Sequence, residues 1–282
     1  MTRRYTRLAW TAAACTYLLI ILGAVVRITG SGLGCGEHWP LCNGRLLPPL
    51  DLPTWIEWSH RLVAGLVTGL VTALAAYTWW LREHGAGSTE QYVPSRAGYV
   101  ALLLLAIQIA LGAVTVKLSL PPWTVILHLG TAMLLLAVLL VSARGSSPRL
   151  RLGAAGLLLL AFATVLLGAL TANLGAATAC LGFPLCNGQL VPGGNYTQDI
   201  HWAHRLLAYT LFAATLRWAQ RTRARGPAIV FALVMLQLTV GATMVLLALP
   251  PVLQAAHVAV GAAVWSAVVL TTTSKDRSVQ AA

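Results

Sequence analysis

Two short segments of this chain carry polar side chains beside long apolar runs. In WIEWSHRL, residues 55–62, Glu57 and His60 lie three positions apart and would share one face of a helix. In IHWAHRL, residues 200–206, His204 again precedes an arginine. An imidazole can ligate a metal and a buried carboxylate can accept a proton, so these residue types could form a ligand site with a proton acceptor beside it.

The two segments belong to an internal repeat. WPLCNGRLLP at residues 39–48 returns as FPLCNGQLVP at residues 183–192, and the same shift of 144 positions places His60 on His204. Such self-similarity indicates that one structural unit is present twice.

Two further histidines obey a second shift, of 129 positions. LPPWTVILH ends at His128 and LPPVLQAAH ends at His257. QIALGAVTV at residues 108–116 likewise matches QLTVGATMV at residues 237–245. The repeat therefore contains two histidines per copy.

The composition indicates a membrane protein. Of the 282 residues, 58% are hydrophobic and only 9% are charged, whereas about one quarter of an ordinary soluble domain is charged. A helix needs about 20 apolar residues to cross a hydrocarbon layer of roughly 30 Å. In the sixth predicted span, Arg205 and Arg217 leave only residues 206–216 free of charge. The eight predicted spans are 8–28, 58–81, 97–117, 123–143, 152–173, 200–220, 227–249 and 252–273.

We expect an all-α polytopic membrane protein built as two tandem four-helix bundles. Spans one to four would form an N-terminal half of residues 1–145, and spans five to eight a C-terminal half of residues 146–282. Because each repeat has an even number of spans, both halves keep one orientation, and a pseudo-twofold axis should run along the membrane normal. Four-helix bundles commonly hold cofactors between facing helices.

The distribution of the basic residues behind the net charge of +12 indicates orientation in the membrane rather than binding to nucleic acid. Fourteen of the nineteen basic residues lie before the first span, after the last span, or in alternate connections. By the positive-inside rule, both termini are then cytoplasmic and the cysteine-containing connections are outside. We interpret the N-terminal apolar run as a retained first span rather than a cleaved signal peptide, since no small-residue cleavage pattern follows it.

Four cysteines form two close pairs in connections assigned to the outer side. Cys35 and Cys42 lie in the first such connection, and Cys180 and Cys186 lie in the third. We expect a disulfide in each, because the outer compartment is oxidising. A metal site is the alternative, although these spacings match no zinc pattern.

The central observation is the placement of the four repeated histidines. His60, His128, His204 and His257 each lie near the outer end of an even-numbered span. Two facing imidazoles in an apolar bundle can hold an iron porphyrin from both sides, whereas a bare metal ion would want three or four protein ligands. Each histidine taken alone could instead be an interfacial hydrogen-bonding residue, but four in register favour haem ligation.

Nearby cations could pair with the carboxylates of such a porphyrin. Arg61 and Arg205 directly follow two of the histidines and would reach propionates, or lipid phosphates as the alternative. Arg27, near the outer end of the first span, is a further candidate. His38 and His84 break the repeat and are expected to be solvated.

The two halves differ one turn before the repeated histidine. The shift that places His60 on His204 places Glu57 on His201. Glu57 would face the same cavity as His60 and could accept a proton. A structural alternative is a capping box, with Thr54 as the N-cap of the helix and Glu57 at its third position.

These residues resemble the haem A synthase family. The matching motifs are GAVVRITGSGLGCGEHWPLC at residues 23–42, EWSHRL at residues 57–62, and the later FPLCNG and HWAHRL. The resemblance covers nearly the whole chain and implies an eight-span enzyme of a bacterial-type cytoplasmic (inner) membrane. Such an enzyme oxidises a methyl group of haem o to a formyl group, giving haem A for terminal oxidases. It also implies that the loop disulfide Cys35–Cys42 lies near the substrate site.

The resemblance further implies a role for each histidine pair. The C-terminal half would bind haem b through His204 and His257, and the N-terminal half would take haem o between His60 and His128. Glu57 would be the catalytic carboxylate. Besides membrane lipid, candidate partners are haem o synthase and assembly factors of terminal oxidases.

Two other functions would suit parts of the pattern. A di-haem cytochrome for electron transfer or quinol oxidation would use the same four histidines but would need no carboxylate. A transporter would suit the repeats and the membrane setting, but the chain lacks the broken helices expected of one.

Overall fold

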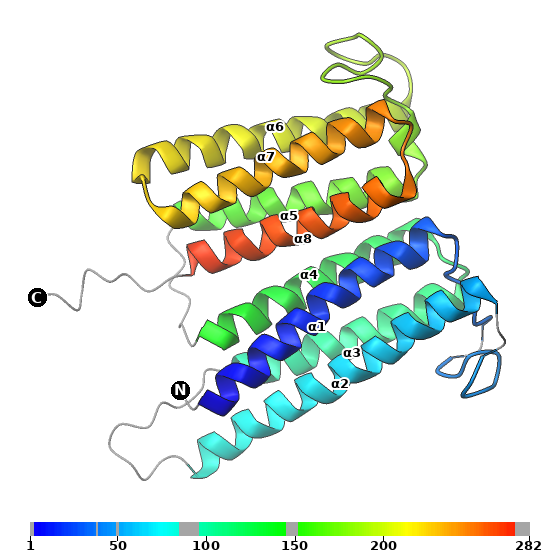
Figure 1. Cartoon of the computed structure of the whole chain (residues 1–282), viewed down its shortest axis with the longest axis vertical. Coiled ribbons are helices and arrows are strands. Elements are labelled where there is room, and N and C mark those ends of the chain that lie inside the picture. The colour runs from blue at the N-terminus through cyan, green and yellow to red at the C-terminus, as the bar shows by residue number, and fades with distance from the viewer. Residues whose placement is uncertain (1–2, 38, 49–50, 85–95, 145–151, 274–282) are drawn as a thin grey trace, which may run out of the picture.

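The computed structural model describes residues 3–37, 39–48, 51–84, 96–144 and 152–273. Within these ranges the chain forms eight α-helices and one short 3₁₀ helix, η1, and no strand (Figure 1). His38 and the junction between the predicted halves lie outside the described residues. The helices are α1 (Arg3–Ile28), α2 (Leu52–His84), α3 (Ala97–Lys117), α4 (Pro122–Arg144), α5 (Leu152–Asn173), α6 (Tyr196–Thr222), α7 (Arg225–Leu246) and α8 (Pro251–Thr272), with η1 (Ala176–Thr178) between α5 and α6.

The helices confirm the all-α prediction, and seven of those described are long and apolar enough to cross a membrane. The eighth is α6, the span that Arg205 and Arg217 interrupt in the sequence. The sequence placed the start of the second span at residue 58, but α2 begins six residues earlier, at Leu52. The apolar run marks only the hydrocarbon part of a helix, and α2 extends beyond that part.

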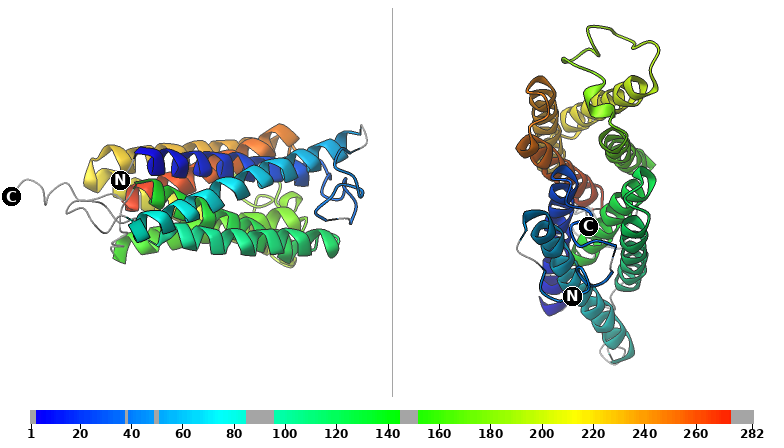
Figure 2. Two further views of the ribbon diagram at one scale, coloured as in Figure 1. Left: turned by 90° about the horizontal axis from the view of Figure 1, so that it is seen from below. Right: turned by 90° about the vertical axis from the view of Figure 1, so that its right-hand side faces the viewer.

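Neighbouring helices run in alternate directions, so α1 begins and α8 ends at the same end of the molecule (Figure 1). Within the first four helices, α1 packs against α2 and α4, and α3 packs against α2 and α4. The last four helices repeat these contacts, since α5 packs against α6 and α8, and α7 against α6 and α8. Contacts of α1 and α4 with α8, and of α4 with α5, join the two sets, which lie side by side in Figure 2.

Tight turns connect α3 to α4 and α7 to α8 in the same way. Ser119 and Leu120 both have positive φ angles, of 58° and 63°, and Ala248 and Leu249 have φ angles of 57° and 62°. The amide of Leu120 donates to the carbonyl of Thr115 at 2.8 Å, which closes the end of α3. A proline then starts α4 and α8, where its missing N–H is not needed. The turns therefore fix where each following helix begins.

A buried indole joins α8 to α4. Trp265, with 4% of its surface exposed, donates from Nε1 to the carbonyl of Met133 at 2.8 Å. Nearer the other end of the interface, the hydroxyl of Tyr17 on α1 donates to the carbonyl of Ala259 on α8 at 2.9 Å. In an apolar interface, an unpaired polar group is costly, so these bonds select one packing of the two sets of helices.

We predict that Trp265→Phe lowers the melting temperature of the purified protein in detergent. The change removes the hydrogen bond from the indole to the Met133 carbonyl, at a cost of about 0.5–1.5 kcal/mol. Trp79→Phe is the matched control, because 54% of Trp79 is exposed. Equal melting temperatures for the two variants would contradict the prediction.

Candidate functional site

Four histidines lie at similar depths in helices that start at one end of the molecule. His60 lies eight residues after the start of α2, and His204 lies eight residues after the start of α6. His128 and His257 each lie six residues after the start of α4 and α8. At about 1.5 Å per residue, these separations correspond to about 12 Å and about 9 Å along the helix axes.

A glycine of a neighbouring helix faces each of these rings. A Cβ atom added to any of the four glycines would lie about as close to the ring as packing permits, or closer. Each imidazole can therefore occupy its position only because the facing residue has no side chain. The pairs are Gly23 with His60, Gly112 with His128, Gly168 with His204 and Gly241 with His257, with added Cβ atoms at 3.3, 3.1, 2.8 and 3.0 Å from the nearest ring atom.

The two histidines of each half come from helices that are not direct neighbours in the bundle. His60 and His128 lie on α2 and α4, and His204 and His257 lie on α6 and α8. Among the described residues, α2 does not pack closely against α4, nor α6 against α8. Each pair of ligand candidates therefore approaches from two separate helices.

In the second half, a cavity lies between these helices. Both His204 and His257 line it, together with Phe183, Tyr209 and Val234. A cavity with an apolar lining and two opposed imidazoles suits a flat iron porphyrin.

Two glutamines contact the second histidine of each pair. Nε2 of Gln108 lies 3.0 Å from Nε2 of His128, and Nε2 of Gln237 lies 3.1 Å from Nε2 of His257. If the amide donates, Nε2 of the neutral ring accepts and the ring proton is on Nδ1. The amide then occupies the Nε2 lone pair, so an iron at this nitrogen would have to displace the glutamine. The Nδ1 atoms of His128, His204 and His257 are buried without a hydrogen-bond partner among the described residues, which fits rings that await a ligand.

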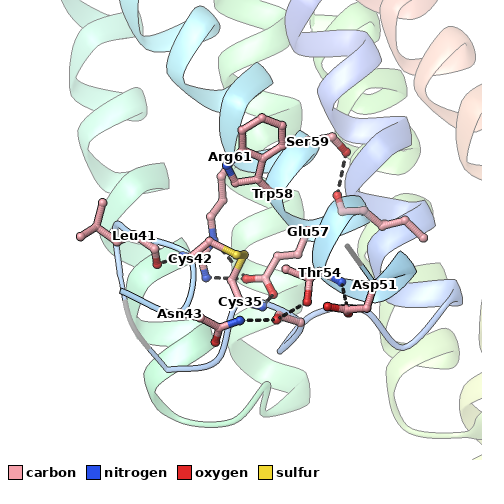
Figure 3. Close-up of a disulfide and its surroundings, with 12 residues drawn as sticks. Cys35, Leu41, Cys42, Asn43, Asp51, Thr54, Glu57, Trp58, Ser59 and Arg61 are labelled. Carbon is pink, nitrogen blue, oxygen red and sulfur yellow. Dashed lines mark hydrogen bonds and ion pairs between the residues drawn. A yellow bond between two sulfur atoms is a disulfide. The ribbon is translucent and has the colours of Figure 1, made fainter. Parts of the chain in front are cut away.

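Glu57 lies near the start of α2 and ties this helix to the first disulfide loop (Figure 3). Its side chain is 5% exposed, and its Oε2 accepts a hydrogen bond from the amide of Cys35 at 2.7 Å. Its Oε1 accepts from Nε and Nη2 of Arg61, at 3.1 and 2.5 Å. The carboxylate therefore forms a buried pair with Arg61, with lone pairs remaining on each oxygen.

The capping-box interpretation of Glu57 is wrong. The side chain of Asp51, just before α2, accepts from the amide of Thr54 at 3.1 Å, which is the N-cap interaction (Figure 3). Hydrogen bonds from Thr54, first its side chain and then its backbone, hold the pKa of the Asp51 carboxyl below its usual range. Thr54 itself donates to the carbonyl of Gly34 at 2.7 Å. Glu57 is six positions into the helix and caps nothing.

Arg61 and Arg205 hold their disulfide loops in matching ways. Nη1 of Arg61 donates to the carbonyl of Leu41 at 2.9 Å, and Nη1 of Arg205 donates to the carbonyl of Leu185 at 2.8 Å. These contacts leave the prediction of propionate pairing untested. Arg205 is 5% exposed and also lines the cavity beside His204.

The second half replaces the carboxylate by a neutral group. His201 is 6% exposed, and its Nδ1 lies 3.0 Å from the carbonyl of Ala176. Nη2 of Arg205 donates to the carbonyl of Cys180 at 3.0 Å. The arginine thus contacts peptide oxygens where its first-half counterpart contacts Glu57.

Both predicted cysteine pairs are joined in the structure. The Sγ–Sγ distances are 2.00 Å for Cys35–Cys42 and 1.98 Å for Cys180–Cys186. In the part of the chain that the structure describes, no group of three or more metal-ligating side chains gathers. The disulfide interpretation therefore holds over the metal-site alternative.

Sequence reasoning missed the glycines and glutamines beside the rings. A signal for them was present, because QIALG at 108–112 and QLTVG at 237–241 occupy matching places in the repeat. Each segment places a glutamine and a glycine four residues apart, on one helix face. Only the packing of α3 on α4 and of α7 on α8 shows that this face meets a histidine.

Comparison with known proteins gives one matching family and several relatives. A family model described as "Cytochrome oxidase assembly protein" (COX15-CtaA) matches residues 6–269. A "Heme A synthase" of Bacillus licheniformis is 32% identical over 212 residues, covering 69% of this chain and 68% of the relative. Another, of Symbiobacterium thermophilum, is 32% identical over 251 residues, covering 80% of each. A "Protoheme IX farnesyltransferase" of Thermus thermophilus is 32% identical over 301 residues, covering 94% of this chain but 47% of the relative.

We predict that Gly168→Ala weakens binding of iron protoporphyrin IX about tenfold or more. The new methyl group would lie 2.8 Å from His204, and overpacking of this kind costs about 1–3 kcal/mol. Gly156→Ala is the matched control on α5, because nothing lies within 4 Å of its added Cβ. The measurement is an optical titration of the purified variants, and equal dissociation constants would refute the packing argument.

Proposed function

Because the chain belongs to the COX15-CtaA family of cytochrome oxidase assembly proteins, we propose that it is a haem A synthase. It is a membrane-bound, haem-dependent oxidoreductase that converts a methyl group of haem o into the formyl group of haem A. The relatives named for this activity are about 30% identical over most of the chain.

One structural observation carries this proposal. Two pairs of histidines lie at matching depths in opposed helices, and each ring packs on a glycine that leaves it room. An enzyme with a porphyrin as substrate and another as electron carrier needs two such sites in one membrane domain.

We assign the substrate site to the N-terminal half, residues 1–145, and the resident site to the C-terminal half, residues 146–282. His60 and His128 hold haem o; His204 and His257 hold haem b. The presence of Glu57 beside the first pair alone supports this order. Haem b, when bound, supplies a one-electron carrier.

The membrane arrangement is part of the same proposal. All eight helices cross the membrane, as two tandem bundles related by a pseudo-twofold axis along its normal, with both termini cytoplasmic and the disulfide loops outside. The matching turns and helix contacts of the two sets support the axis. The crossing of α6 is supported by Arg205, whose buried charge is directed at loop carbonyls rather than lipid.

Glu57 is the catalytic carboxylate in this proposal. Overall, CH3 + H2O gives CHO + 4 H+ + 4 e−, so the methyl group and one water together release four protons, and the four electrons pass to an external electron acceptor. A proton acceptor is therefore needed close to the methyl carbon. Arg61 and the Cys35 amide fix the carboxylate in place. Arg61 and Arg205 also lie where propionates could reach them.

A protohaem farnesyltransferase is the proposed source of the substrate. The Thermus relative that bears this name is about twice as long as the region it shares with this chain. A farnesylated haem made nearby would reach the first site without leaving the membrane. Assembly factors of terminal oxidases are the proposed receivers of the product.

We predict that Glu57→Gln lowers the rate of haem A formation by about 100-fold or more, while iron porphyrin affinity changes by less than about threefold. The amide can still accept from Cys35, but it cannot take a proton. Asp51→Asn is the control, because asparagine caps a helix as well as aspartate does. Haem A formation at the parental rate in Glu57→Gln would remove this role.

Expression of the chain together with a haem o source tests the function itself. Pigments extracted from the membranes should contain haem A, and His60→Ala should abolish it. A plain di-haem cytochrome would instead yield only unmodified haems together with a reversible reduced-minus-oxidised spectrum.

A further inference from the structure

Arg27 is a cation at the boundary between the two halves. It lies in the last turn of α1 and is partly buried. Its Nη2 reaches across to Oε1 of Gln254 on α8, at 3.4 Å, and it forms no ion pair with a carboxylate of the described residues. A guanidinium held at such a place without an anion is costly, which indicates that its anion is a ligand.

The position of Arg27 relates it to the first histidine pair. Arg27 follows Gly23 by four residues, one turn along α1, so both lie on one helix face. Gly23 packs against His60, with its added Cβ 3.3 Å from Nε2. Arg27 is therefore one turn outward from the ring that would ligate the substrate iron.

Gln254 keeps the guanidinium from turning to the lipid. Its own Nε2 donates to the carbonyl of Leu249 at 2.7 Å, which orients Oε1 towards Arg27. Gln254 also precedes His257 by three residues on α8. The second half of the protein thus positions a cation that belongs to the first half.

The repeat contains no second copy of this contact. Gly23 corresponds to Gly168 by a shift of 145, which places Arg27 on Ala172. Gln254 corresponds to Val125 by the shift of 129. The Arg27–Gln254 pair therefore has no equivalent at the matching positions of the repeat. Glu57 is likewise found in the first half and is replaced by His201 in the second.

The other cation near the first pair already has a partner. Both Nε and Nη2 of Arg61 bind the carboxylate of Glu57, and its Nη1 binds a loop carbonyl. A propionate at Arg61 would have to share this guanidinium with Glu57. No carboxylate of the described residues pairs with Arg27, so a propionate there would not be shared.

We propose that Arg27 binds a propionate of the porphyrin held between His60 and His128, with Gln254 as its positioning partner. The inference rests on the proposed function, since it requires a porphyrin in the first half. It gives the substrate a defined rotation about the iron axis, because one carboxylate edge is directed to the boundary with α8.

Iron protoporphyrin IX and its dimethyl ester test the proposal, because they differ only in the carboxylates. The first site is isolated in a His204→Ala, His257→Ala background and the second in a His60→Ala, His128→Ala background. Optical titrations give the ratio of the two dissociation constants, ester over acid. We expect Arg27→Met to lower this ratio about tenfold in the first background and to leave it unchanged in the second.

Three further variants keep the test decisive. Arg27→Lys should retain most of the preference for the acid, and Gln254→Leu should lower it by about threefold, since the charge stays but is less well directed. Arg144→Met is the matched control, an arginine at the other end of the interface whose Nη1 contacts the carbonyl of Leu270. Helix content by circular dichroism shows whether each variant is folded.

The outcomes separate the inference from the proposed function. An unchanged ratio for Arg27→Met in the first background, or an equal fall in both backgrounds, would overturn the role of Arg27. Failure of both porphyrins to bind in either background would instead overturn the proposed function.

Discussion

The contact between an imidazole and a glycine on the next helix is the interaction on which the rest of this structure depends. A histidine in a membrane interior must have a partner, and a planar cofactor needs both of its histidines at one depth with clear space between them. The four glycines let the rings lie against the neighbouring backbone, while Nδ1 of His128, His204 and His257 lacks a hydrogen-bond partner among the described residues. The turns that start α4 and α8 at prolines then set the depth of two of the rings.

The two halves use this common frame differently. Around the first pair, Glu57, Arg61 and the Cys35 amide form a charged cluster under the disulfide loop. Around the second pair, His201 and Arg205 contact peptide carbonyls. The first site therefore contains a carboxylate–guanidinium pair, whereas the second contains a guanidinium bound to peptide oxygens. Duplication followed by change at a few polar positions accounts for both.

The predicted helices and disulfides follow from strong local signals. Apolar runs, proline starts and loop cysteines each have a physical meaning that needs no distant contact. Helix ends are weaker signals, which is why α2 begins at Leu52 rather than at residue 58. The cap of α2 was misplaced for a related reason: Asp51 and Thr54 are both good N-cap residues, and the sequence does not say where the first turn begins.

The sequence by itself determined the repeat, the helical class, the four histidines and the asymmetry of Glu57 against His201, because each depends on residue type and spacing along one chain. Only the tertiary structure decided what these residues contact. Gly23 meets His60, Glu57 meets Cys35, and Arg27 meets Gln254, 227 positions away. Such contacts join different helices, and the relative rotation and height of helices are set by the packing of whole faces, which no local pattern contains.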